Sequence, residues 1–480
     1  MDQIGNIVTA SLTVYALATG IFLISENRRP QATLAWMLAF FFAPGIGLLA
    51  YVLFGRPRKA FSRRNLLGED LEGRVVSLLR PILGREDEAI TKLSNNSGHR
   101  RLMTLVRRNS RSALTTRNKV EILQDAAAFY PRMMEDLKAA RHSIYLQYFI
   151  WRTDGFGEQL KSILAEKARS GIQVRLLYDP LGSRADFNPG YVADMQAAGV
   201  QMVPTSPLYR IHTISYRNHR KITVVDGTIG YTGGMNIGDE HIDGGKYPSW
   251  RDTQIRLTGE AATLLQAVFM VDWQSATGED LFSESALATE NAVPAEGDIP
   301  VQILTSGPDS DWAAIRQLYF TMISTARRHV FLQSPYFVLD ASIAEALKTA
   351  ALSGIDVRVM LSAPGPSDIL AGWAGNTYMA EVVAAGVRVY LYTKGYLHAK
   401  TISVDSEICS IGSANMDIRS FSINYELNAV LYSARLTTEL ERAFERDLAY
   451  CTAFDVAEYR RRNPLLRFRD SVARLLSPLM

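Results

Sequence analysis

The chain has 480 residues, of which 47% are hydrophobic and 21% are charged, and its formal net charge is +3. This length suits two or three domains with their own cores, and the composition excludes a largely disordered chain. The small net charge excludes a protein that binds nucleic acid through strong overall basicity. Its two cysteines, Cys409 and Cys451, exclude a cysteine-rich metal cluster or a disulfide framework, which is typical of a reducing compartment.

Two long uncharged stretches, residues 7–24 and residues 32–54, form the N-terminus. Each approaches the ~20 residues that a helix needs to cross ~30 Å of hydrocarbon, and a polar turn separates them. A cleaved signal peptide is one alternative, but the chain starts without a basic segment and a second apolar stretch follows at once. A buried soluble hairpin is the other alternative. We expect two transmembrane helices, forming a hairpin in residues 1–57.

Positive charge predicts the orientation of this hairpin. Two arginines lie in the turn, whereas five basic residues follow the second stretch: Arg56, Arg58, Lys59, Arg63 and Arg64. Because cytoplasmic flanks carry the excess of lysine and arginine, everything after residue 56 is expected to be cytoplasmic. The basic cluster can also contact anionic headgroups. Residues 58–114 are expected to form a juxtamembrane linker region.

Beyond residue 115 the chain repeats itself. Four short segments recur in the same order with small insertions, which predicts two copies of one folding unit. The matched pairs are Leu146–Gln147 with Leu332–Gln333, Ser170–Arg175 with Ser353–Arg358, Ala197–Val200 with Ala384–Val387, and His219–Lys221 with His398–Lys400.

Each copy alternates helices with strands, which predicts an α/β sheet covered by helices on its faces. Gly199 and Gly386 follow predicted helices and suit helix C-caps. We expect domains at residues 115–286 and 300–455, and a basic tail at 456–480 that is either an amphipathic, surface-seeking helix or a basic solvated one. The expected helices are 126–140, 157–169, 313–326 and 343–352, and the expected strands are 143–150, 174–178, 330–338 and 357–361.

Both copies contain the pattern His-x-Lys-x4-Asp, six residues, Gly-[Gly/Ser]-x-Asn. The Lys-to-Asp interval is apolar and β-branched and predicts a strand, on which the histidine and lysine share one face. This pair suits a phosphodiester, because the lysine offsets anionic charge while a neutral histidine attacks phosphorus or protonates an oxygen. The candidate catalytic residues are His219, Lys221, Asp226, His398, Lys400 and Asp405.

Other polar residues near the motifs are expected to support this chemistry. The motif aspartates are expected to be structural supports rather than reacting groups. Asn236 and Asn415 follow glycines and can donate hydrogen bonds to phosphoryl oxygens. A nucleophilic histidine needs a carboxylate on its other nitrogen, and Asp252 and Glu426 are the candidates.

Other catalytic classes fit the sequence less well. A metal site is not predicted, because a cationic lysine follows each motif histidine and cysteine is absent from both motifs. A serine nucleophile is not predicted, because no Gly-x-Ser-x-Gly elbow stands out. His212, His241 and His329 lack comparable surroundings and are interpreted as surface or core residues.

With these motifs, residues 115–450 resemble the phospholipase D superfamily and, within it, the bacterial cardiolipin synthases. The apolar N-terminus, Gln147–Phe149, Tyr231–Asn236 and Gly412–Ser420 carry the closer resemblance. It implies two duplicated phospholipase D-like α/β/α sandwich domains with one active site at their pseudo-twofold interface, without a metal or other cofactor. Gly234, where many members have serine, and Ser406, which replaces the commoner glycine of the turn, depart from the pattern.

The resemblance also implies a reaction. A phosphatidyl group passes from one phosphatidylglycerol to another through a phosphatidyl-histidine, giving cardiolipin and glycerol at the bacterial inner membrane. By family habit His219 is the nucleophile and His398 the acid/base. A phospholipid hydrolase, a transferase that uses another alcohol, a nuclease of the same superfamily and a non-catalytic membrane scaffold are the alternatives. The membrane spans and near-neutral charge speak against nucleic acid as a partner.

Overall fold

The computed structural model describes residues 14–15, 17–26, 30–51, 55, 63–93, 97–207, 209, 215–282, 297–365 and 369–477. It divides into two units. The N-terminal unit comprises residues 1–61 with 208–215, and the large unit comprises residues 62–207 with 216–480.

The N-terminal unit contains two short helices where one long span was expected. Helix α2 (Pro30–Phe42) ends at Ala43, and α3 (Pro44–Ala50) starts at a proline, which suits a first helical position. Within the described residues, no helix combines the length and the apolar character that a membrane crossing demands. Residues 7–13 and 16 of the first expected span and residues 52–54 of the second lie outside the described part, as do residues 27–29 and 56–62.

The first copy in the large unit is built on a seven-stranded sheet with the order β2-β9-β7-β6-β3-β4-β5. Its strands are β2 (Asn118–Gln124), β3 (Ser143–Tyr148), β4 (Gln173–Tyr178), β5 (Gln201–Pro204), β6 (Ile222–Val225), β7 (Ile229–Gly233) and β9 (Thr253–Gly259). Its helices are α6 (Asp125–Ala139), α7 (Gly155–Arg169), α8 (Pro189–Ala197), α9 (Glu240–Asp243) and α10 (Glu260–Thr277).

The second copy is built on a nine-stranded sheet with the order β1-β10-β19-β17-β16-β11-β13-β14-β20. Its strands are β1 (Leu114–Thr115), β10 (Val301–Ser306), β11 (His329–Ser334), β13 (Asp356–Ser362), β14 (Arg388–Tyr392), β16 (Thr401–Val404), β17 (Ile408–Gly412), β19 (Glu426–Leu431) and β20 (Cys451–Ala453). Its helices are α12 (Ala314–Ser324), α13 (Ala341–Leu352), α14 (Ile369–Ala384), α15 (Ile418–Ser422) and α16 (Ala434–Asp447).

The order of the seven inner strands of the second sheet repeats that of the first, strand for strand, so the predicted duplication is confirmed. Both central pairs illustrate the match, since β3 lies between β6 and β4 as β11 lies between β16 and β13. Gly199 and Gly386 adopt positive φ of 97° and 101° behind α8 and α14, as expected for helix C-caps.

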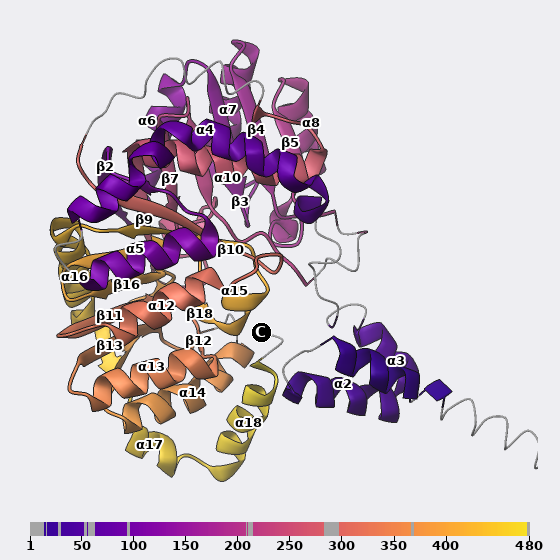
Figure 1. Ribbon diagram of the computed structural model, residues 1–480, viewed down its shortest axis with the longest axis vertical. Coiled ribbons are helices and arrows are strands. Elements are labelled where there is room, and N and C mark those ends of the chain that lie inside the picture. The colour runs from indigo at the N-terminus through magenta and orange to yellow at the C-terminus, as the bar shows by residue number, and fades with distance from the viewer. Residues whose placement is uncertain are drawn as a thin grey trace, which may run out of the picture. The chain divides into compact units, whose positions relative to one another are not determined.

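Helices cover both faces of each sheet (Figure 1) because side chains alternate along the strands. On β3, Leu146 packs with α6 and α7, whereas Tyr145 stacks on Phe269 of α10 with ring centroids 4.9 Å apart. On β11, Leu332 packs with α12 and α13, whereas Phe331 stacks on Phe444 of α16 at 5.0 Å. The two copies share one hydrophobic core that includes residues of both sheets, α10 and α16.

Residues 58–114, predicted as a linker, instead contain two helices that pack on the large unit: α4 (Arg63–Leu93) and α5 (Ser97–Ser110). Glu86 of α4 is buried, accepts a hydrogen bond from the N–H of Leu114 at 2.9 Å and lies 3.3 Å from Arg107 of α5. Arg85 forms an ion pair with Glu260 of α10. No helix was expected there, although Leu102, Met103 and Val106 of α5 have the spacing of a buried helix face.

Two short helices, α17 (Val456–Arg461) and α18 (Pro464–Leu475), end the described chain. Residues 283–296, between the two copies, lie outside the described residues.

Candidate active site

Each motif histidine is held by a carboxylate from the other copy. The Nδ1 atom of His219 lies 3.0 Å from Glu426, and that of His398 lies 2.6 Å from Asp252. Both carboxyl side chains are fully buried. Such a bond fixes the Nδ1–H tautomer and leaves Nε2 available for chemistry. The sequence named both carboxylates, but it contained no signal that they are exchanged between the copies.

Short backbone contacts between the copies produce this exchange. The N–H of His219 donates to the carbonyl of Tyr425 at 2.9 Å, and the N–H of His398 donates to that of Arg251 at 2.7 Å. In both cases the acceptor is the residue directly before the orienting carboxylate. Around His398 the contact extends into a two-stranded parallel sheet of β8 (Trp250–Arg251) and β15 (Tyr396–Leu397). Backbone hydrogen bonds therefore set which carboxylate each histidine receives.

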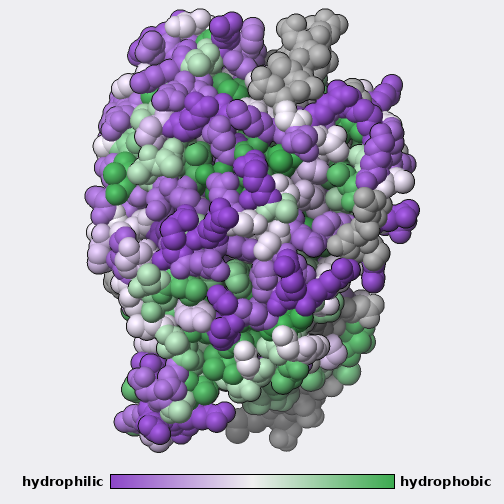
Figure 2. All heavy atoms as spheres, turned by 90° about the vertical axis from the view of Figure 1, so that its left-hand side faces the viewer, coloured by the Kyte–Doolittle hydropathy of each residue, from purple (hydrophilic) through white to green (hydrophobic). Residues whose placement is uncertain are grey.

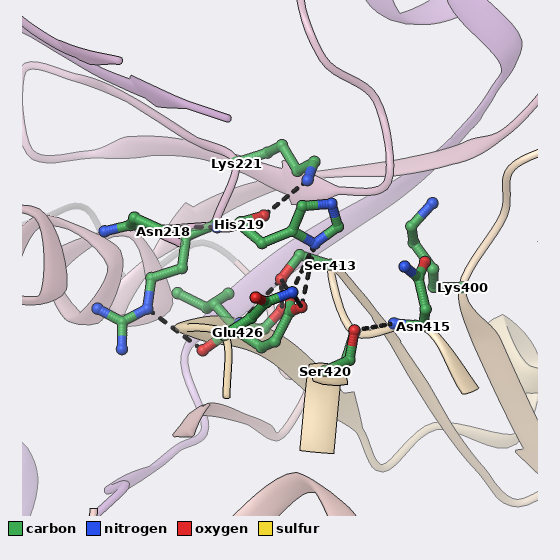
Figure 3. Close-up of polar contacts among 12 residues, drawn as sticks. Asn218, His219, Lys221, Lys400, Ser413, Asn415, Ser420 and Glu426 are labelled. Atoms are coloured by element: carbon green, nitrogen blue, oxygen red, sulfur yellow. Dashed lines mark hydrogen bonds and ion pairs between the residues drawn. The ribbon is translucent and has the colours of Figure 1, made fainter. Parts of the chain in front are cut away.

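The two motif lysines are buried beside the histidines. Lys221 donates from Nζ to the carbonyl of His219 at 2.6 Å, and Lys400 does the same to the carbonyl of His398. Their exposed fractions are 0% and 1%. Figure 3 shows Lys221 on one side of the His219 ring and Glu426 on the other. Two ammonium groups in one buried site favour an anionic ligand.

Burial lowers the pKa of both histidines below the ordinary value, and it does so most strongly for His398. The pKa of His219 is lowered less, because Glu426 opposes the effect. Although burial acts to raise it, the pKa of Glu426 is lowered on balance by the charges of His219 and Lys221. Burial instead raises the pKa of Asp252. Both imidazoles are therefore neutral near pH 7 in the free protein, as a nucleophile must be.

Burial also lowers the pKa of both lysines, that of Lys400 to about 8. The cost of burying the ammonium groups is offset in part by Asp252 and Glu426. A bound phosphodiester would offset it further, because an opposite charge favours the protonated lysine.

The motif aspartates lie at the far end of their strands, away from the histidines. Asp226 accepts hydrogen bonds from the N–H groups of residues 141–143 at 2.7–2.9 Å, and Asp405 from those of residues 327–329 at 2.7–3.0 Å. Both have positive φ, 51° and 57°. These contacts join the turn after β6 or β16 to the start of β3 or β11, which is a structural role.

The two motif asparagines border the site in different ways. The side-chain oxygen of Asn236 accepts from the N–H of Ile150 at 3.2 Å, which leaves its amide NH2 as the donor. Asn415 and Lys400 lie together across from His219 in Figure 3. The Oδ1 atom of Asn415 is buried and has no hydrogen-bond partner. As an acceptor, this oxygen fits a hydroxyl donor of a ligand, whereas the amide NH2 of Asn415 is the group that can donate to a phosphoryl oxygen.

The departure at Gly234 has a steric cause. A Cβ at Gly234 would lie 2.1 Å from Oδ1 of Asp252, so this carboxylate occupies the space of a side chain. At the equivalent place in the other half, Ser413 donates its hydroxyl to Glu426 at 2.5 Å. The two half-sites therefore hold their histidines with different pairs of residues.

Two buried arginines, which the sequence pattern did not mark, donate hydrogen bonds to the backbone carbonyls of these carboxylate residues. Arg220 contacts Asp272 of α10 at 2.6 Å and donates to the carbonyl of Glu426 at 3.2 Å. Arg251 contacts Asp447 of α16 at 2.9 Å and donates to the carbonyl of Asp252 at 2.5 Å. Arg251 adjoins the quoted Asp252, and Arg220 lies inside the motif, but nothing in the pattern marks either as buried.

The remaining histidines have separate places. His241 is buried beside the site, with its ring centroid 6.1 Å from that of His398, and burial lowers its pKa to about 3. His329 pairs with Glu441 at 2.9 Å. His212 lies outside the described residues. No cluster of three or more potential metal ligands occurs in the described part of the chain.

Comparison with known proteins gives consistent matches. The family model described as "Cardiolipin synthase, PLD-like domain" matches residues 133–245 and 319–448, and that described as "Phospholipase_D-nuclease N-terminal" matches residues 11–56. A cardiolipin synthase of Geobacillus kaustophilus is 40% identical, with 98% of this chain and 93% of the relative covered. The major cardiolipin synthase of Bacillus subtilis is 37% identical, with 96% of each covered.

Among solved structures, the phosphatidylserine synthase of Haemophilus influenzae has a similar fold, with a TM-score of 0.61 at 14% identity. The likeness covers 80% of this chain and 100% of that one. At this identity the match shows the fold alone.

The pKa of Lys400 leads to a prediction on anion binding. The affinity for a non-cleavable, singly charged phosphonate analogue of a phospholipid should fall as the pH rises through about 8, because Lys400 then loses its proton. Competitive inhibition in detergent micelles, measured at a series of pH values, tests this. An uncharged analogue of the same chain length serves as the control and should show no such change. A constant affinity for the phosphonate across this range would contradict a cationic Lys400 in the site.

The space at Gly234 leads to a second prediction. In Gly234→Ala the new methyl group must displace Asp252 and free the His398 ring, so turnover should fall roughly 10²-fold or more. Ser413→Gly is the matched control, since it removes one hydrogen bond without intruding and should cost only about 10-fold. Both variants should unfold near the wild-type temperature. Equal losses in the two variants would show that Gly234 does not act through Asp252.

Proposed function

The chain belongs to the cardiolipin synthase family of phospholipase D-like phosphatidyltransferases, and on this premise we propose the reaction that its site performs. It transfers a phosphatidyl group from one phosphatidylglycerol to a second one, and the products are cardiolipin and glycerol. The observation that supports this proposal is that two half-sites, one from each copy, form one buried site. Each half-site supplies a histidine with a fixed tautomer and a lysine, which is the set that a two-step phosphoryl transfer needs.

In the first step, Nε2 of His219 attacks the phosphorus of the first phosphatidylglycerol. The bond from phosphorus to the glycerol oxygen breaks, and His398, which carries a proton once the anionic lipid is bound, gives this proton to the departing oxygen. The product is a phosphatidyl-histidine and free glycerol. The charge of the phosphodiester raises the low pKa of His398 on binding, so the donor is protonated where it is needed.

In the second step, the glycerol hydroxyl of another phosphatidylglycerol enters. His398 takes its proton, as microscopic reversibility requires, and the oxygen attacks phosphorus while the bond to His219 breaks. Lys221 and Lys400 stabilise the anionic phosphoryl oxygens throughout, and Asn236 and Asn415 contact them. Asp252 and Glu426 keep the imidazoles oriented, while Asp226 and Asp405 support the strands.

The opposite assignment of the two histidines has one observation in its favour. Burial lowers the pKa of His398 more strongly than that of His219, where the charge of Glu426 opposes the effect. His219 therefore holds a proton more readily, which suits an acid. A phosphatidyl adduct mapped to one histidine decides between the assignments.

The N-terminal unit is the candidate membrane attachment. Residues 11–56 match an N-terminal family model, and α2 and α3 expose large apolar side chains. Phe41, Phe42 and Ile46 are 71%, 76% and 74% exposed. We propose that this unit embeds in the bacterial inner membrane and that the large unit lies on its cytoplasmic side.

Membrane attachment can be tested by extraction. Because apolar side chains rather than charges make the contact, a carbonate or high-salt wash of isolated membranes should leave the protein in the pellet. A detergent should release it. Recovery of the chain in the carbonate supernatant would overturn the embedded N-terminal unit, and a periplasmic readout from a reporter fused after residue 480 would overturn the orientation.

The reaction is tested by incubating the purified chain with phosphatidylglycerol alone and identifying the products by mass spectrometry. His219→Ala and His398→Ala should each lower cardiolipin formation roughly 10³-fold or more, and the double variant should be no worse, because either loss stops the cycle. Acid-quenched wild-type enzyme should carry a phosphatidyl adduct on His219.

The exposed His142, which lies outside the site, supplies the control variant, and His142→Ala should retain wild-type turnover. An adduct on His398 would reverse the roles of the two histidines. Near-normal turnover in either catalytic alanine variant would defeat the proposed mechanism, and phosphatidic acid as the main product would show a hydrolase instead.

A further inference from the structure

Helix α18 is fixed to the large unit by one face only. Asp470 and Ala473 on this inner face are 0% and 1% exposed, and Ser477, just after the helix, is 2% exposed. Asp470 accepts a hydrogen bond from the side-chain amide of Asn376 in α14 at 3.0 Å. The hydroxyl of Tyr378 donates a hydrogen bond to the hydroxyl of Ser477 at 3.2 Å. The helix therefore has a defined rotation about its axis, and its outer face cannot turn inward without breaking these buried contacts.

The outer face of α18 carries a stripe of large apolar side chains. At about 100° per residue, its four members lie within about 80° of one another, on the side opposite the buried face. The members of this apolar stripe, with their exposed fractions, are Leu465 (75%), Phe468 (68%), Val472 (41%) and Leu475 (78%). A contiguous exposed row of this kind is characteristic of an interaction surface.

The segment that contains the apolar stripe is rich in positive charge. Residues 456–476 contain six arginines and two acidic residues, Glu458 and Asp470, an excess of 6 − 2 = 4 positive charges. Arg469 and Arg474 pair with Asp470 and Glu381. The other four have no carboxylate partner among the described residues: Arg460, Arg461, Arg462 and Arg467. Their charge is therefore available to an external anion.

We propose that the apolar stripe of α18 docks on an anionic lipid surface. An amphipathic helix that is rich in arginine binds in the plane of the headgroups, with its apolar side chains in the acyl boundary and its basic side chains among the phosphates. Arginines can reach the headgroups while their methylene stems cover apolar surface. The surface lies outside the active site, so the inference does not depend on the proposed reaction.

A second copy of the chain fits this surface less well. A symmetric dimer brings the same patch of both partners together, so it would place the unpaired arginines of the two copies against one another. A stable protein interface also needs about 800 Å² from each partner, which is more than one narrow stripe of four side chains provides. Lipid phosphates supply negative charge to pair with the arginines, which the same surface of a second chain does not.

The stripe also differs from the far side of the same unit. Helix α16 lies on the side of the large unit away from α18 (Figure 1), and Figure 2 shows that this face is mostly hydrophilic with scattered hydrophobic side chains. On α16 the buried residues form one face, and the exposed ones include Arg435 and Glu439. The α18 face of this unit is therefore better suited to contact a membrane than the α16 face.

The test uses the full chain with a fluorescent probe that reports its surroundings. Cys451 is replaced by serine, Cys409 is fully buried, and Phe468→Cys or Leu475→Cys carries the label. The protein is reconstituted into vesicles of phosphatidylcholine alone or with one third phosphatidylserine. Two quenchers are compared, aqueous iodide and lipids with a nitroxide on the acyl chain. Leu352→Cys is the matched control, because Leu352 at the end of α13 is 75% exposed.

In phosphatidylserine vesicles the α18 probes should shift to shorter emission wavelength, lose most of their intensity to the nitroxide lipids and resist iodide. The Leu352 probe should respond only to iodide. Replacing residues 460–462 together by glutamine should return the α18 probes to the behaviour seen in pure phosphatidylcholine. Retained cardiolipin formation in detergent micelles shows that the variants are folded.

Three results would overturn the proposal. Quenching of the α18 probes by iodide alone would show a solvated helix. Resistance to both quenchers would show that protein covers the stripe, either another segment of this chain or a second copy. Equal nitroxide quenching with and without phosphatidylserine would show that the arginines do not recognise anionic lipid.

Discussion

The exchange of buried carboxylates between the two copies is the constraint on which the rest of the site depends. Glu426 orients His219 and Asp252 orients His398, and all four residues are buried. Removing one member of such a pair leaves a buried polar group without its hydrogen-bond partner, which typically costs about 1–3 kcal/mol. The copies must therefore dock correctly before either histidine has its working tautomer. Folding of the large unit and assembly of the site are the same event.

Four further charged side chains are buried in this arrangement. Lys221 and Lys400 lie next to the exchanged pairs, and Arg220 and Arg251 lie behind them. Each arginine joins a helix carboxylate, Asp272 or Asp447, to the carbonyl of an orienting residue in the site. These links position the backbone from which Glu426 and Asp252 extend. These charge pairs thus hold the two orienting residues in place beside the two buried lysines.

Much of this was predictable from local patterns. The repeated segments predicted two copies, and β-branched runs with strand spacing predicted the elements around His219 and His398. The docking of the copies was not predictable, because two similar motifs contain no record of which carboxylate faces which histidine. From the sequence, Gly234 was identified only as a position where many members have serine. The space around Asp252 shows why no side chain fits there. Helices α4 and α5 were not expected, and contacts such as the hydrogen bond from Leu114 to the buried Glu86 are visible only in the structure.

The difference between Gly234 with Asp252 and Ser413 with Glu426 has a consequence for the origin of acid and base. In a symmetric dimer of identical subunits, both imidazoles have the same surroundings. At any moment they can differ only in which of them carries a proton. Covalent fusion of two copies removes this identity, since each copy can then mutate alone. The division of labour between the histidines becomes a heritable property of the gene, which selection can tune one residue at a time.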